Sequence, residues 1–208
     1  SLGGTAAYNT TTGAWTAPSY TVGSTAYNNV GAAIAALNSA SGSTKYFHAN
    51  STLADSSAAG TDSVAIGPQA VASAPGNVAL GFNAQALSGT SLAIGQDAKT
   101  GATVGDGVAV GFGASVLNFS SGTAIGSSAS TTGGFGTALG NKALAENNNG
   151  IAVGYNARSL NASAGANNEA GSIAIGNNSV ARANGTDPFN LSAATVVGNA
   201  ATAIADGA

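Results

Sequence analysis

The stretch that decides the fold is Val64-Ala65-Ile66-Gly67-Pro68-Gln69-Ala70: an apolar residue, Ala, an apolar residue, Gly, two variable residues and Ala. The phrase recurs with glycine-to-glycine spacings of 14, 14, 16, 15, 14, 14, 22 and 22 residues. The later copies begin at Val78, Leu92, Val108, Thr123, Thr137, Ile151, Ile173 and Thr195. Self-similarity at a nearly fixed period indicates a repeat architecture, in which each copy is one structural unit.

Each copy predicts two short strands. The apolar-Ala-apolar triplet is rich in β-branched residues, which favour strands, and the glycine after it marks a turn. A second strand is expected from the next alanine, as in Ala70-Val71-Ala72, and a second turn follows, as in Pro75-Gly76-Asn77. Two strands and two turns in about 14 residues predict an all-β fold, a flat parallel β-roll of about nine coils stacked ~4.8 Å apart.

The middle residue of the triplet is the informative one. Because side chains alternate across a strand, we expect Val64 and Ile66 to face the interior and Ala65 to face outward. A strand that is apolar on both faces is typical of double burial, so this stripe predicts packing against identical copies, whose number the stripe leaves open. The alternative is that alanine occupies exposed positions and was copied by duplication. The predicted interface comprises Ala65, Ala79, Ala93, Ala109, Ala124, Ala138, Ala152, Ala174 and Val196.

Residues 1–44 carry no copy of the repeat. Trp15 to Val22 is interpreted as an extended strand with a turn at Pro18, and Asn28 or Asn29 is expected to cap a short helix over Val30–Leu37. Its apolar residues fall on one face, which includes Ile34. An isolated helix of this length is marginal, so that face also needs a partner.

Composition excludes several functions. Charged residues make up 6% of the 208-residue chain and the net charge is −3, with no basic cluster for nucleic-acid binding. The chain has no cysteine for disulfides or thiolate metal sites. It contains no apolar run of ~18 residues and no signal peptide at Ser1-Leu2-Gly3-Gly4. We expect both ends to be cuts through a longer chain.

Catalytic chemistry is not predicted. His48 is the only histidine, and no nucleophile motif accompanies it, so a structural role is favoured. Gly133-Gly134-Phe135-Gly136 lacks the Asp of calcium-binding repeats. The period of 14 is not a multiple of the six residues used by acyltransferase solenoids. We therefore predict no enzyme activity, no cofactor and no metal.

Three segments resemble the trimeric autotransporter adhesins. Ser63-Val64-Ala65-Ile66-Gly67 is similar to the repeat of YadA-type heads, Lys45-Tyr46-Phe47-His48-Ala49-Asn50-Ser51 to the family's HANS connector, and Trp15 to Asn38 to its Trp-ring module. The resemblance implies a left-handed β-roll, a homotrimer with Trp15 and Ile34 in its interface, and an outer-membrane anchor outside this stretch. It divides the chain into 1–44, a Trp-ring-like module; 45–60, the connector; and 61–208, the head.

The function that this resemblance implies is attachment of a bacterial cell surface to host cells or extracellular matrix. Ligand contacts are expected from outward second-strand residues and from the insertions near Ser159–Gly171 and Arg182–Thr195, where Phe189 is the candidate hot spot. The alternative for Phe189 is that its loop packs back on its own coil. The alternative for the whole chain is a structural spacer that projects other adhesin domains. An ice-binding roll is excluded, because the outward second-strand positions form no regular threonine ladder.

Overall fold

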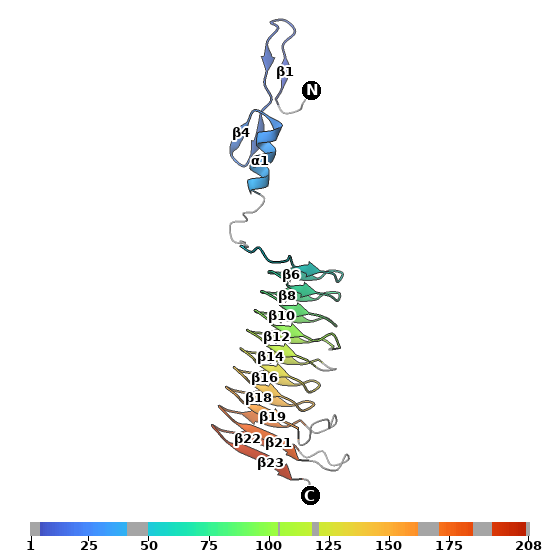
Figure 1. Cartoon of the computed structure of the whole chain (residues 1–208), viewed down its shortest axis with the longest axis vertical. Coiled ribbons are helices and arrows are strands. Elements are labelled where there is room, and N and C mark those ends of the chain that lie inside the picture. Colours follow the sequence, from blue (N-terminus) through green and yellow to red (C-terminus); the bar gives the residue numbers. More distant parts are fainter. Residues whose placement is uncertain are drawn as a thin grey trace. The chain divides into compact units, whose positions relative to one another are not determined.

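The computed structural model describes residues 5–40, 50–103, 105–117, 121–161, 171–184 and 193–206. The chain divides into two compact units, Ser1–Asn50 and Ser51–Ala208. Figure 1 shows the first as hairpins with one helix and the second as a stack of strands. The two units are described separately.

The N-terminal unit is built from two hairpins and a helix. Strands β1 (Ala7–Tyr8) and β2 (Trp15–Thr16) pair antiparallel, as do β3 (Tyr20–Val22) and β4 (Thr25–Tyr27). Helix α1 (Val30–Ala40) contacts β3 and β4. Its N-cap is Asn29, whose Oδ1 accepts a hydrogen bond from the backbone N–H of Ala32 at 2.7 Å. The predicted helix and cap are therefore present, and the helix extends to Ala40.

The C-terminal unit consists of two parallel sheets. The nine-stranded first sheet contains the apolar-Ala-apolar triplets as β6 (Val64–Ile66), β8 (Val78–Leu80), β10 (Leu92–Ile94), β12 (Val108–Val110), β14 (Thr123–Ile125), β16 (Thr137–Leu139), β18 (Ile151–Val153), β20 (Ile173–Ile175) and β22 (Thr195–Val197). The ten-stranded second sheet contains β5 (Ser57–Ala58), β7 (Val71–Ala72), β9 (Gln85–Ala86), β11 (Lys99–Thr100), β13 (Ser115–Val116), β15 (Ser130–Thr131), β17 (Leu144–Ala145), β19 (Arg158–Leu160), β21 (Val180–Asn184) and β23 (Thr202–Asp206).

The register follows the repeat, because equivalent residues of successive copies pair with each other. Ala79, for example, lies between Ala65 and Ala93 in the first sheet. This arrangement confirms the predicted all-β parallel β-roll with a small β-plus-helix module before it. Strand β5 already pairs with β7, so the roll begins a few residues before the predicted position 61.

Glycine closes the turn after each first-sheet strand. Gly111 has φ +134°, a conformation that disfavours L side chains, and a Cβ there would lie 2.6 Å from the carbonyl oxygen of Gly126 in the next coil. Its backbone N–H donates to the carbonyl of Ile94 at 2.8 Å. The stacked glycine backbones therefore need a residue without a side chain at this position.

The interior of the roll is a thin layer of small side chains. Alanines meet there with no exposed area, among them Ala79 and Ala93 from the first sheet, Ala86 from the second sheet and Ala84 from the link before it. Where the second sheet contributes the larger Val116, the opposing position is Gly122, whose Cβ would lie 3.1 Å from Val116 Cγ1. Large and small residues thus compensate across the interior.

The buried polar side chains of the roll include an asparagine whose Nδ2 and Oδ1 are both hydrogen-bonded. Asn77 is fully buried. Its Nδ2 donates to the carbonyl of Ala86 at 2.8 Å, and its Oδ1 accepts from the backbone N–H of Ser91 at 2.8 Å. Because both partners lie in the next coil, this side chain ties two neighbouring coils together without an unpaired polar atom.

Candidate functional site

The outer face of the first sheet is an apolar surface that runs along the described roll. It consists of the first and third residues of each triplet, and we call it the apolar face. Fifteen of these 18 side chains are Val, Ile or Leu and three are Thr, and none is buried. The most exposed of its aliphatic residues are Val64 (43%), Leu80 (40%), Ile125 (38%), Leu139 (44%), Ile175 (38%) and Val197 (71%).

The orientation predicted for these strands is wrong. The middle residues of the triplets point into the roll and the flanking residues point outward. The predicted outward stripe is Ala65, which is half-buried, Val196, which is 8% exposed, and seven alanines with no exposed area: Ala79, Ala93, Ala109, Ala124, Ala138, Ala152 and Ala174.

The short connection between the sheets explains this orientation. Only four residues separate each first-sheet strand from the following second-sheet strand. Sheets that pack through large side chains lie ~10 Å apart, and such a short link holds the two sheets too close for large side chains to face inward from both of them at the same place. Alanines therefore fill the interior, and the large side chains remain outside without cover from this chain.

The N-terminal unit also exposes apolar side chains. Trp15 is 60% exposed, and Val30, Ile34 and Leu37 on α1 are 44%, 59% and 58% exposed. Ala33 is the residue of α1 that packs inward, at 8% exposure. The unit thus has little apolar interior of its own.

The outer face of the second sheet is mixed in character, as predicted. None of the nine residues predicted to point outward is buried: Val71, Gln85, Lys99, Ser115, Ser130, Leu144, Arg158, Val180 and Thr202. Ser115 Oγ donates to Ser130 Oγ at 3.0 Å along this face. Such a surface needs no apolar partner.

The two edges of the roll differ in how much their length varies. The constant edge consists of the four-residue links that follow first-sheet strands, such as 67–70. The variable edge consists of the links that return to the first sheet, which range from five residues, as in 73–77, to twelve, between β19 and β20. Both predicted insertions belong to the variable edge; the candidate residue Phe189 lies outside the described residues.

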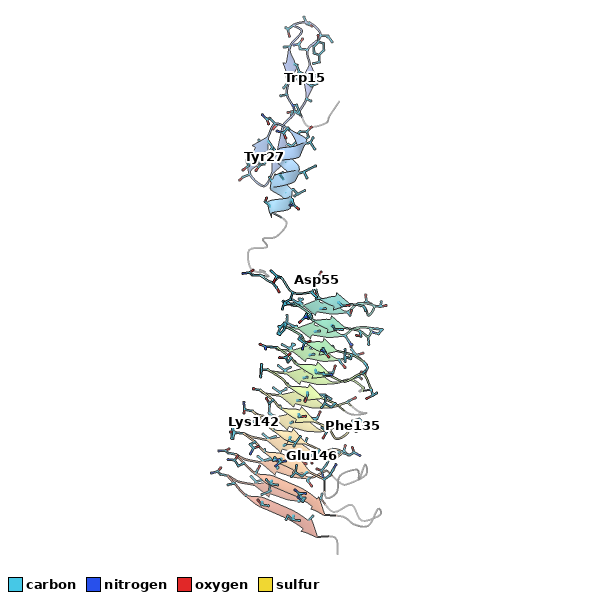
Figure 2. All side chains as sticks on the ribbon, in the orientation of Figure 1. Trp15, Tyr27, Asp55, Phe135, Lys142 and Glu146 are labelled. Carbon is cyan, nitrogen blue, oxygen red and sulfur yellow. The ribbon has the colours of Figure 1, made fainter. Side chains whose placement is uncertain are left out.

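Exposed aromatic residues occur at both edges, and sequence reasoning missed them. Phe82, Phe112 and Tyr155 follow the turn glycine on the constant edge and are 38%, 56% and 50% exposed. Phe135, on the variable edge, is 63% exposed. Figure 2 shows Phe135 at the edge of the roll opposite Lys142 of the constant edge. The signal was available, because a large aromatic residue is unusual in a tight turn.

The described part of the chain contains no group of side chains that could hold a metal ion. Groups of three or more His, Asp or Glu side chains are absent from it. Asp55 is exposed, and its Oδ1 accepts a local hydrogen bond from the backbone N–H of Ser56 at 2.8 Å. His48 lies outside the described residues. The described helix is also too short and insufficiently apolar to cross a membrane.

Comparisons with known proteins identify the repeat. The family model of the YadA head domain repeat matches residues 58–84, 78–98, 120–143, 132–157 and 168–186. Among solved structures, a C-terminal YadA-like domain from Burkholderia pseudomallei is 57% identical over a match that covers 42% of this chain and 43% of that one, with a TM-score of 0.27. No curated protein matches the chain.

Proposed function

Because the roll of this chain is a YadA-type head, we propose that the chain is the head part of a homotrimeric surface adhesin that attaches a bacterium to host cells or extracellular matrix. The head family implies trimeric assembly and a surface-exposed position, and its members are adhesin domains rather than enzymes. In this proposal the membrane anchor belongs to a part of the protein outside this sequence.

The observation that carries the proposal is the uncovered apolar face. Its Val, Ile and Leu side chains run along the whole first sheet, from Val64 in β6 to Val197 in β22. Each square ångström of apolar surface removed from water contributes about 25 cal/mol, so a face of this length strongly favours association. Closed rotational symmetry buries the same face of every copy. The interface is thus reassigned from the alanine stripe to the apolar face.

The N-terminal unit joins the same assembly in this proposal. Trp15 and Ile34, which the family resemblance assigns to the trimer interface, are both more than half exposed in a single chain. Three parallel copies of α1 would bury their exposed apolar side chains against one another, as neighbouring helices do in a bundle. A short helix gains most of its stability from such packing.

The mass in solution tests the assembly. We expect three times the 19.5 kDa of one chain. Leu139→Asp would place a charge in the apolar face and should dissociate the trimer, because a buried unpaired carboxylate is strongly unfavourable. The matched control is Leu144→Asp on the outer face of the second sheet, which should remain trimeric. A wild-type mass of 19.5 kDa, or a trimeric Leu139→Asp variant, would contradict the proposed interface.

Adhesion is tested by binding to immobilised collagen, fibronectin and laminin and to cultured epithelial cells. The adhesin proposal expects saturable binding by the wild-type trimer. Replacement of residues 185–192, which lie between β21 and the buried Ala194 before β22, by a short turn is expected to abolish binding and to leave the trimer intact. A trimer that binds none of these surfaces would favour the spacer role instead.

A further inference from the structure

Phe135 has a backbone conformation that is unfavourable for its side chain. It lies two residues before its first-sheet strand and has φ +55°. The equivalent positions with positive φ in other links of the variable edge hold Asp62, Gly76 and Asn149, which are the residue types that tolerate this region. A bulky side chain there is strained, and such strain persists only where the surrounding structure enforces it.

The surrounding turn holds the backbone of Phe135 in place. The backbone N–H of Gly134 donates to Asn148 Oδ1 at 2.8 Å, and the backbone N–H of Asn149 donates to the carbonyl of Gly134 at 2.7 Å. Gly133, Gly134 and Gly136 are all buried. The conformation is therefore fixed by the next coil.

The ring of Phe135 does not compensate for this strain within its own chain. With 63% of the residue exposed, it buries little apolar area on the roll. Asn, Asp or Gly would fit the turn without strain, as at the three equivalent positions. Packing in a single chain thus gives no reason for a phenylalanine here.

The variable edge is also the edge that is most compatible with solvent in the trimer. Its links range from five to twelve residues, whereas every link of the constant edge has four. Insertions are tolerated where the backbone faces solvent. The exposure of the variable edge rests on the proposed trimer, in which the apolar faces are joined and this edge stays free.

We propose that Phe135 is a preorganised aromatic anchor that inserts into an uncharged apolar pocket on a partner protein. Large side chains that fill a pocket on the partner are the usual hot spots of protein interfaces. In the neighbouring coils, the positions equivalent to Phe135 hold Ser121 and Asn149, which are small and polar. A ring already held in its bound position loses little entropy on binding. A sugar ligand fits less well, because it needs several free polar groups and Asn148 Oδ1 is already engaged by Gly134.

A random peptide library displayed on phage, selected against the wild-type trimer, tests the anchor. We expect enriched peptides with apolar and aromatic residues, and Phe135→Asn should weaken their binding by at least about thirtyfold. The matched control is Phe112→Asn, which removes an equally accessible ring from the constant edge and should leave binding unchanged. No enrichment, or equal binding to the Phe135→Asn trimer, would overturn the proposal.

Two further measurements on the same variants separate the alternatives. Phe135→Asn should raise the melting temperature, because it relieves the backbone strain. Phe112→Asn should not raise it. An unchanged or lower melting temperature for Phe135→Asn would show that the turn is not strained. Dissociation of the Phe135→Asn trimer would show that the ring is a contact between copies and would overturn the anchor. If Phe135→Asn loses binding to a glycan array but keeps its binding to the peptides, the ligand is a sugar and the anchor is also overturned. Failure to bind matrix proteins, with peptide binding intact, would refute the proposed function and leave the anchor standing.

Discussion

At the scale of single residues, the small volume of the interior limits the size of the side chains that fit there. Thr131 is a fully buried residue of the second sheet, and two glycines that directly precede first-sheet strands, Gly122 and Gly136, lie next to it. The Oγ1 of Thr131 is buried without a hydrogen-bond partner. This part of the interior is therefore closely packed and carries one unsatisfied hydroxyl.

The substitution Gly122→Ala is expected to destabilise the roll by about 1–3 kcal/mol, because overpacking of a filled core displaces its neighbours. The new Cβ would lie 2.7 Å from Thr131 Oγ1 and 3.1 Å from Val116 Cγ1. Adding Thr131→Ala should restore most of the loss, since it removes both the closest atom and the unpaired hydroxyl. Thermal unfolding measures both variants, and an unchanged melting temperature for Gly122→Ala would contradict the packing.

The orientation of the alanine stripe shows why sequence reasoning failed at this scale. Val64-Ala65-Ile66 is apolar on both faces, so alternation alone does not say which face is inside. We expected large side chains to fill the interior. The four-residue link 67–70 was the deciding feature, because it holds the sheets close together. Ala70, at the end of that link, and Ala72 in the second sheet, both fully buried, were the signal that the interior is filled mainly by small side chains.

At the scale of elements, one coil is the unit of structure. Each strand pairs with its equivalents in the neighbouring coils, and the hydrogen bonds of each turn also run to the next coil, as from the N–H of Gly81 to the carbonyl of Ile66 at 2.8 Å. Coils are therefore interchangeable wherever their interior residues are similar in size. The stability of such a repeat is approximately the sum of unit and nearest-neighbour terms.

Deletion of residues 68–81, one complete coil, should leave a folded and slightly less stable roll. Gly67 would then precede Phe82, and Ser63 would stack on Ser91, whose side chain makes the same hydrogen bond within its turn. Deletion of 68–80, one residue fewer, shifts the register and turns every following side chain to the opposite face. Circular dichroism should show β structure in the first variant and its loss in the second; equal spectra would contradict this expectation.

Sequence reasoning identified the repeated elements better than the isolated ones. The triplets were predicted because a period marks them, and the helix cap was narrowed to Asn28 or Asn29 because asparagine is a favoured cap residue. The hairpin of β1 and β2 was not predicted, since two-residue strands such as Ala7–Tyr8 leave no alternation to detect.

At the scale of the whole roll, the two edges are expected to differ in how much stability the roll loses when residues are inserted. Insertion of eight Gly and Ser residues between Pro75 and Gly76, on the variable edge, should lower stability by about 1 kcal/mol, the entropy of a longer loop. The same insertion between Gln96 and Asp97 on the constant edge should lower it several-fold more, because every link of that edge has four residues and holds the two sheets close together. Urea unfolding of the two variants measures the difference, and similar midpoints would show that the edges are equivalent.

The direction of the backbone hydrogen bonds has a mechanical consequence. The strands are stacked along the roll, as Figure 1 shows, so the bonds between neighbouring coils point along its length. A tensile force along the roll therefore acts on all bonds of one coil interface together, and the extension before rupture is small. If the chain is the adhesin head proposed above, it would act as a stiff tether under flow, and the coil interface with the fewest bonds would set the force at which the roll opens.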